Sequence, residues 1–161
     1  MDLAEPGGKG IYLKVGESQK GIVNIILEKA HVSGSAYHGI HISDCVLRDK
    51  CGGGLGGGGD GSPASISAHL ANVKIESVGY GAFDGDGIWI DERGEGSIYT
   101  TVIDSLFSRV GADGIELDEG NKGDVMAQII RSRFVDTGNY CDPTVLKKCI
   151  SKRQSEEELR N

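Results

Sequence analysis

The chain has 161 residues, of which 26 are glycine and 38% are hydrophobic. Glycine is about twice as frequent as its usual share of roughly 7%, yet glycine and proline together stay below the level of disordered or collagen-like chains. The 17 Lys and Arg residues against 24 Asp and Glu residues give a net charge of −7. This disfavours a nucleic-acid partner, because phosphate binding depends on Lys and Arg. We expect one globular domain.

Apolar runs stay short along the chain, as at Ile25–Leu27. A membrane-spanning helix needs about 20 apolar residues, so we expect no membrane span. The residues after Met1 also lack the charged and then apolar pattern of a secretory signal.

A repeat organises the chain. It begins faintly at Gly10–Leu13, is clearer at His38–Asp44, and is clearest at Asp86–Glu92, which returns 27 residues later as Asp113–Glu119. Apolar residues alternate within each copy, as in Ile88 and Ile90, which predicts short strands. Internal repeats of this length indicate stacked units that bury their apolar faces only against one another.

A second phrase lies between these copies. Val102–Gly111 is matched by Ile129–Gly138, and the same apolar spacing occurs in Leu27–Val32 and Leu70–Gly79. Each unit therefore has the order strand, turn, strand, glycine turn, strand. A leucine-rich repeat has a similar period, but its L-x-x-L-x-L-x-x-N phrase is absent here.

The phrases DGIxLDE and I-x-x-S-x-F-x-x-x-G resemble those of right-handed parallel β-helix repeat proteins, the superfamily typified by pectate lyases. The resemblance covers about residues 9–140. It implies an all-β, right-handed parallel β-helix, a solenoid of about five turns. It also implies a secreted or periplasmic protein, with a signal that this sequence does not contain.

Two segments depart from the repeat. The glycine-rich residues 52–63 predict a loop within the β-helix domain of residues 1–140, either a lid or a plain insertion. In the tail, residues 141–161, Asp142 and Pro143 begin a pattern that predicts a short helix capping the open end of the coil.

The four cysteines, Cys45, Cys51, Cys141 and Cys149, lack the spacing of a zinc or redox motif. Disulfides and buried free thiols both remain open. If the capping helix forms, Cys141 and Cys149 lie roughly 12 Å apart, too far to form a disulfide.

The alternation directs a second set of side chains outward. If Ile88 and Ile90 face the interior, Trp89 and Asp91 face solvent. Stacking then predicts three columns of outward residues: His41, Trp89 and Glu116; Ser43, Asp91 and Asp118; Asp44, Glu92 and Glu119. Carboxylates one strand spacing apart repel each other, so we expect a counter-ion.

Calcium would meet this need, because it binds carboxylate, carbonyl and water oxygens. The candidate metal ligands are Asp84, Asp86, Asp91, Asp113, Asp118 and Glu119. The alternative is that these carboxylates accept hydrogen bonds from turn amides. The sequence does not decide between the two.

The resemblance implies three functions. The leading one is an extracellular module that binds a polysaccharide or another extended ligand on its exposed strand face, through Trp89, His41 and Glu116, with calcium as a candidate cofactor. The second is a small polysaccharide lyase or epimerase with Arg93, Arg109 or Arg131 as base. The motif set of polygalacturonases is absent. The third is a self-associating structural solenoid.

Paired carboxylates also admit glycoside hydrolysis. The catalytic candidates are then Asp91, Glu92, Asp118, Glu119 and Arg93. The N-terminal residues, Met1–Lys9, contain too few apolar side chains to cover the end of a coil. We therefore expect a homo-oligomer, formed through the N-terminal edge, or a fragment of a longer solenoid.

Overall fold

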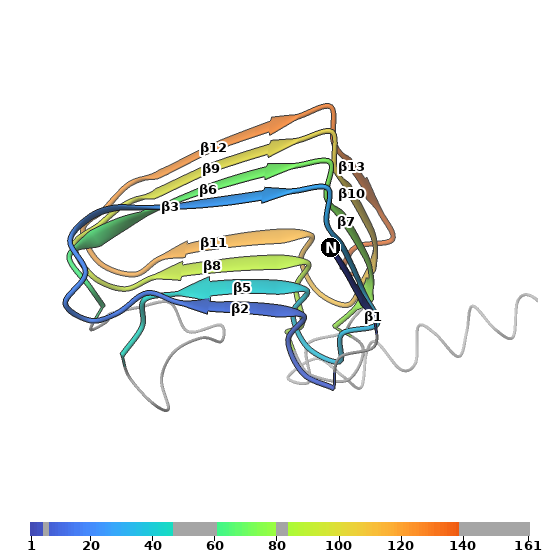
Figure 1. Cartoon of the computed structure of the whole chain (residues 1–161), viewed down its shortest axis with the longest axis horizontal. Coiled ribbons are helices and arrows are strands. Elements are labelled where there is room, and N and C mark those ends of the chain that lie inside the picture. Colours follow the sequence, from blue (N-terminus) through green and yellow to red (C-terminus); the bar gives the residue numbers. More distant parts are fainter. Residues whose placement is uncertain (5–6, 47–60, 80–83, 139–161) are drawn as a thin grey trace, which may run out of the picture.

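The computed structural model describes residues 1–4, 7–46, 61–79 and 84–138. These ranges contain thirteen strands and no helix, and the strands form three parallel sheets (Figure 1). Sheet A contains β1 (Asp2–Ala4), β4 (His31–Ser33), β7 (Lys74–Val78), β10 (Leu106–Val110) and β13 (Arg133–Val135). Sheet B contains β2 (Ile11–Lys14), β5 (Ile40–Ser43), β8 (Ile88–Glu92) and β11 (Ile115–Glu119). Sheet C contains β3 (Gly21–Glu28), β6 (Ala64–Ala71), β9 (Ile98–Ile103) and β12 (Val125–Ile130).

The chain visits sheets B, C and A in turn, so that each coil contributes one strand to each sheet. Neighbouring strands therefore come from successive coils. In sheet B, Ile11 pairs with Ile40, Ile40 with Ile88, and Ile88 with Ile115. This register confirms the predicted parallel β-helix and stacks the copies of the sequence repeat directly on one another.

The core is the set of inward side chains of all three sheets. Ile40, Ile88, Ile66, Ile75 and Phe107 are almost completely buried. Burying an aliphatic or aromatic side chain of this size contributes about 1.5–3 kcal/mol. Equivalent residues stack along the axis, because a parallel ladder repeats each side-chain position from coil to coil. The repeat thus continues through the core as apolar columns.

The corner between sheets C and A repeats in every coil. Its first residue has a left-handed backbone, with φ between 48° and 53° at Lys29, Asn72, Asp104 and Arg131. Its second residue closes the corner. In the last coils that residue is serine: Ser132 Oγ accepts from Ser105 N at 3.1 Å, and Ser105 Oγ accepts from Val73 N at 3.1 Å. These hydroxyls thereby accept hydrogen bonds from backbone amides that are not paired with a neighbouring strand.

A glycine precedes each strand of sheet B, at Gly10, Gly39, Gly87 and Gly114. A Cβ atom on Gly39 would lie 2.7 Å from Gly87 O, and one on Gly87 would lie 2.4 Å from Gly114 O. No side chain fits at these separations. The glycine of the repeated DGI phrase is therefore required by the close approach of successive coils.

Several predictions concern residues outside the described ranges. The capping helix, Cys51, Cys141 and Cys149 fall there, as does most of the loop predicted for residues 52–63. Cys45 is described and is disulfide-bonded. Within the described ranges, no helix is long and apolar enough to cross a membrane.

Candidate functional site

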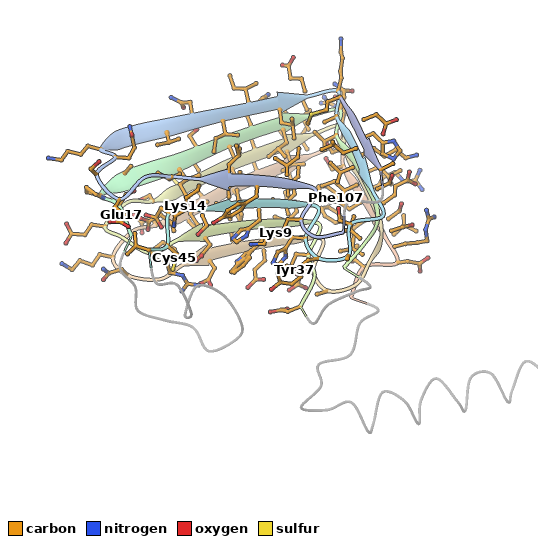
Figure 2. All side chains as sticks on the ribbon, turned by 60° about the horizontal axis from the view of Figure 1, so that its bottom comes forward. Lys9, Lys14, Glu17, Tyr37, Cys45 and Phe107 are labelled. Carbon is orange, nitrogen blue, oxygen red and sulfur yellow. The ribbon has the colours of Figure 1, made fainter. Side chains whose placement is uncertain are left out.

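Two of the three predicted outward columns follow the outward positions of sheet B (Figure 2). In the third, Glu92 has the inward parity of Ile88 and Ile90 and is fully buried, as is Asp44, so that part of the prediction is wrong. Tyr12, His41, Trp89 and Glu116 occupy one register position in the four strands. Lys14, Ser43, Asp91 and Asp118 occupy the next outward position. Glu92 and Glu119 are also paired. The structure therefore brings together the residues that the sequence predicts to form columns.

The predicted solvent exposure is wrong for the first column and also for Ser43 and Asp91 of the second, which are almost completely buried. Trp89 and His41 are each only 3% exposed. The two rings stack with centroids 4.1 Å apart, and the His38 ring lies 4.8 Å from that of Trp89. Side chains from neighbouring coils fill the space above one another, so an outward direction does not ensure contact with solvent. Tyr12, at the edge strand, remains 51% exposed.

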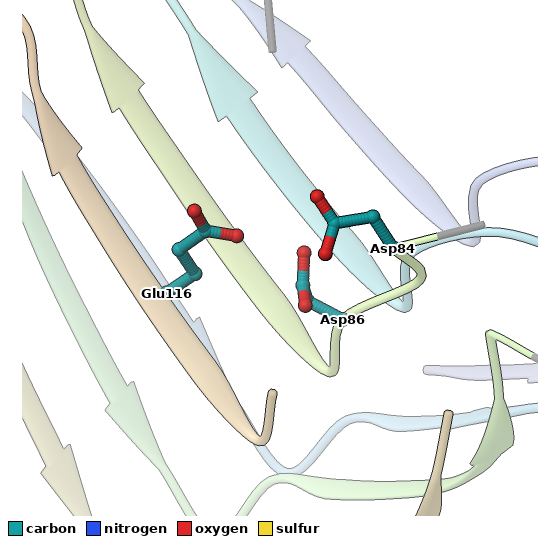
Figure 3. Close-up of side chains that lie close together, drawn as sticks. All are labelled: Asp84, Asp86 and Glu116. Atoms are coloured by element: carbon teal, nitrogen blue, oxygen red, sulfur yellow. The ribbon is translucent and has the colours of Figure 1, made fainter. Parts of the chain in front are cut away.

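Three carboxyl groups converge at one end of this face (Figure 3). Asp84 and Asp86 precede β8, and Glu116 belongs to β11. One carboxylate oxygen from each lies within 4.8 Å of the others. Asp86 is fully buried: its Oδ1 accepts from Asp113 N at 3.0 Å, and its Oδ2 lies 3.1 Å from His38 Nδ1. We call these three residues the carboxyl cluster.

The carboxyl cluster resists full ionisation. Burial, and then the nearby Asp84 carboxylate, raise the pKa of Asp86 to about 7. Burial, and then the Asp86 and Asp84 carboxylates, raise the pKa of Glu116 to about 8. Such a group needs either a proton or a cation to offset the mutual repulsion. Carboxylate oxygens at this spacing are suitable ligands for a hard divalent cation.

The second column contains its own counter-ion. Arg93 donates through Nε to Asp91 Oδ1 and through Nη2 to Asp118 Oδ2. Asp91 is fully buried, and its Oδ2 accepts from Ser43 Oγ at 3.1 Å. The guanidinium thus lies where the sequence predicts a metal ion. Because Arg93 donates to both carboxylates, its guanidinium is not available as a catalytic base.

The third column mainly supports the backbone. Glu92 Oε1 accepts from Gly94 N at 2.9 Å and from Gly96 N at 3.1 Å. Asp44 accepts from Ser62 N and from Arg93 N, both at 2.7 Å. Burial and the adjacent Asp44 carboxylate raise the pKa of Glu92 to about 7.

The remaining candidate residues contribute no side chain to the carboxyl cluster. Glu119 Oε1 accepts from Asn121 N at 2.9 Å. Asp113 meets the cluster through its backbone amide. Arg109 Nε donates to Ser77 Oγ on sheet A, and Arg131 forms a two-pronged pair with Asp104 at the corner. Neither arginine is on sheet B.

Sequence reasoning missed a basic and aromatic group beside the cluster. Lys9 Nζ lies 2.5 Å from His41 Nδ1 and 4.4 Å from the centre of the Tyr12 ring. Burial lowers the pKa of Lys9. Burial, followed by the Lys9 charge, lowers the pKa of His38 to about 3 and that of His41 to about 2.

His38 links this basic group to the carboxyl cluster. Its Nδ1 accepts from Asp86 N at 3.1 Å. The repeat contained a signal for this contact, since His38 in the phrase HGI is equivalent to Asp86 in DGI. Lys9 has the same signal, since KGI in the faint first copy places it at the position equivalent to His38.

Comparison of the chain with protein-family models, curated proteins and solved structures finds no match. The chemistry of the sheet B face is therefore the basis for a functional assignment.

Proposed function

We propose that the outer face of sheet B binds a divalent cation through the carboxyl cluster, and through that cation a carboxylate-bearing glycan. The observation that carries this proposal is the convergence of three carboxyl groups: buried Asp86 turns toward Asp84 and Glu116, and one oxygen of each lies within 4.8 Å of the others (Figure 3). Ionised carboxylates this close together repel each other, and burial strengthens the repulsion. A bound cation would offset it.

Calcium suits this site best. It takes six to eight oxygen ligands in flexible geometry, so three protein carboxyls leave positions for water and for a uronate carboxylate. Without such a cation, the net charge of −7 would repel an acidic glycan. Lys9, just before β2, and Lys14, at the end of β2, add positive charge on the same face (Figure 2).

An extracellular or periplasmic setting is part of the proposal. Disulfides persist in oxidising compartments, and Cys45 is disulfide-bonded. The resemblance to pectate-lyase-like β-helix proteins supports the same location and the same ligand class.

Terbium luminescence tests the cation site. Trp89 is the one tryptophan of the chain and pairs in register with Glu116, so light absorbed by its indole should sensitise terbium bound at the carboxyl cluster. We expect saturable emission that calcium reverses. Asp86→Asn and Glu116→Gln should abolish it, whereas the control Glu95→Gln, at an exposed ion pair with Lys122, should retain it. Emission that is absent, or unchanged in both cluster variants, would contradict the proposal.

Glycan binding is a separate measurement. Titration calorimetry with oligogalacturonate and oligoalginate should show binding in calcium and none after chelation. The matched neutral oligosaccharides should not bind at this site. Calcium-independent binding of the acidic sugars would refute the bridging role of the cation.

A second candidate function is a polysaccharide lyase, and Lys9 is the observation that favours it. Its lowered pKa increases the fraction of neutral amine, which can act as a base. A cation bound to the uronate carboxylate would acidify the adjacent C5 proton. Lys9 would then take that proton, the C4–O bond would break toward the leaving oxygen, and a C4–C5 double bond would form.

The ultraviolet absorbance of unsaturated uronates reports this elimination. Activity on an acidic glycan should disappear in chelator and in Lys9→Met, while Lys122→Met, at an exposed ion pair with Glu95, should retain it. No absorbance change on any acidic glycan would exclude the lyase and leave the binding function as proposed.

A further inference from the structure

The outer face of sheet C differs in chemistry from the rest of the surface. Its outward residues are Ile22, Asn24, Ile26 and Glu28 of β3; Ser65, Ser67, His69 and Ala71 of β6; Tyr99, Thr101 and Ile103 of β9; and Met126, Gln128 and Ile130 of β12. All four strands are described, and among these positions Glu28, at the end of β3, is the one with a formal charge.

This lack of charge is unusual for the chain, of which 25% is Asp, Glu, Lys or Arg. The other two sheets have charged outer faces. Sheet B presents Lys14, Glu116 and Asp118, and sheet A presents Asp2, Lys74, Glu76 and Arg133. The absence of charge is therefore specific to the outer face of sheet C and does not reflect the composition of the whole chain.

The face also exposes apolar groups to solvent. Ile22, Ile26 and Met126 are 58%, 70% and 54% exposed. Hydroxyl and amide side chains lie between them, from Ser67 and Thr101 at the centre to Gln128 at the edge. Figure 1 shows the four strands as one layer, on the side of the coil opposite sheet B.

The size of the face argues against a second copy of the chain as its occupant. The four strands lie about 4.8 Å apart and rise about 3.3 Å per residue, so the flat area of the face is roughly 500 Å². A stable protein interface needs about 800 Å² from each partner. A polymer that continues beyond the face can instead engage many copies of the protein, so a small contact on each is sufficient.

We propose that the outer face of sheet C binds a neutral polysaccharide lying flat across its strands. The absence of charge on this face matches a ligand without charge. The apolar side chains and Tyr99 would contact the C–H faces of the sugar rings. The Ser, Thr, Asn and Gln side chains would exchange hydrogen bonds with the sugar hydroxyls.

This site goes beyond the cation-dependent function of sheet B and does not depend on it. With the two faces on opposite sides of the coil, one molecule could attach to a neutral polymer while it holds an acidic glycan. Of the two proposed binding sites, the one on sheet B requires calcium and the one on sheet C does not.

Depletion from solution by insoluble polysaccharide tests the proposal. The probes are microcrystalline cellulose and chitin powder, with polystyrene beads and phosphatidylcholine vesicles as uncharged surfaces that contain no sugar. We expect the wild-type chain to bind cellulose or chitin in the presence of chelator. Thr101→Lys, at the centre of the face, should weaken binding about tenfold, because the ammonium group would lose water without gaining a partner.

The matched control is Ser33→Lys, which adds the same charge at a half-buried outward position on sheet A. It should bind like wild type, and circular dichroism should show that both variants fold. Glu116→Gln should also bind cellulose or chitin normally, which separates this site from the carboxyl cluster.

Three outcomes would overturn the proposal. The first is the absence of depletion by both polysaccharides. The second is equal binding to the beads or vesicles, which would show an unspecific apolar surface. The third is a dimer that Thr101→Lys dissociates, which would show that a second copy covers this face.

Discussion

Arg93 and Asp118 form an ion pair between two successive coils of the β-helix. Arg93 follows β8, whereas Asp118 lies in β11. The same guanidinium contacts Asp91, so one cation separates two stacked carboxylates. Arg93 is 4% exposed and Asp91 is fully buried. The Arg93–Asp91 pair is therefore shielded from solvent, and each buried charge needs the other for compensation.

Removal of this guanidinium should destabilise the protein strongly. Arg93→Met leaves Asp91 buried without its cation, and a broken buried pair costs about 3–5 kcal/mol. Urea unfolding should show this loss. The matched control is Arg131→Met, which removes an exposed arginine paired with Asp104 and should change the free energy of unfolding little. Equal effects of the two substitutions would contradict a special role for Arg93.

The buried Glu92 should make stability fall as pH rises. Its pKa is raised from 4.5 to about 7, so between these values the folded chain keeps a proton that the unfolded chain has released. Stability then decreases with increasing pH through this window, by at most about 1.4 kcal/mol per pH unit. Glu92→Gln keeps an oxygen for the Gly94 and Gly96 amides and has no such proton.

The measurement is the difference in free energy of unfolding between Glu92→Gln and wild type at several pH values. It should grow in favour of the variant from pH 4.5 to about 7. His38 and His41 contribute the opposite trend at acid pH, but they do so in both proteins and cancel in the difference. Glu119→Gln, at the equivalent position of the next coil, is the control. A constant difference across the range would contradict the prediction.

Substitution within the glycine column should disrupt the stacking of coils. In Gly87→Ala the new Cβ would lie 2.4 Å from Gly114 O, and overpacking of this kind costs about 1–3 kcal/mol. Thermal unfolding should show the loss. Gly16→Ala is the control, because nothing lies within 4 Å of a Cβ there. An unchanged melting temperature in Gly87→Ala would show that the coils can separate at little cost.

The ends of the stack expose inward-facing apolar side chains, which favours self-association. In the last coil Val125, Ile129 and Phe134 are 44%, 50% and 40% exposed. At the other end, Leu13, Val23 and Ile25 line a cavity of about 320 Å³. We propose a homo-oligomer that covers an end, formed through the N-terminal edge.

Light scattering at micromolar concentration tests this assembly. The wild-type chain should be larger than a monomer, and Ile11→Asp should shift it toward the monomer. Ile129→Asp places the same charge at the other end and identifies which end associates. A wild-type chain that stays monomeric at all concentrations is incompatible with this proposal.

The repeat alone was sufficient to predict the fold. Ile88 with Ile115, and the column of Trp89 with Glu116, could be paired from the sequence, because a parallel stack places equivalent residues at equivalent positions. The glycine of the DGI phrase also has a local cause, the close approach of two backbones. Such features depend on neighbouring coils of one repeating pattern, and the pattern is written in the sequence.

The chemistry of the columns depended on tertiary structure. The sequence predicted a counter-ion for Asp91 and Asp118, but not that Arg93 would supply it, because the path of a long side chain is set by packing. It predicted Trp89 outward, but not buried beneath His41 and its neighbours. It divided Asp84, Asp86 and Glu116 between two roles, whereas the fold brings them into one cluster.

The sequence by itself therefore determined the architecture, the register and the outward direction of the first two columns, since these follow from periodicity. Only the tertiary structure decided which of those residues are exposed, which carboxylates share a guanidinium and which gather in one cluster. The physical reason is that periodicity specifies the direction of a side chain, whereas burial and charge pairing depend on side chains from other coils and from the turns between them, such as Lys9 and His38.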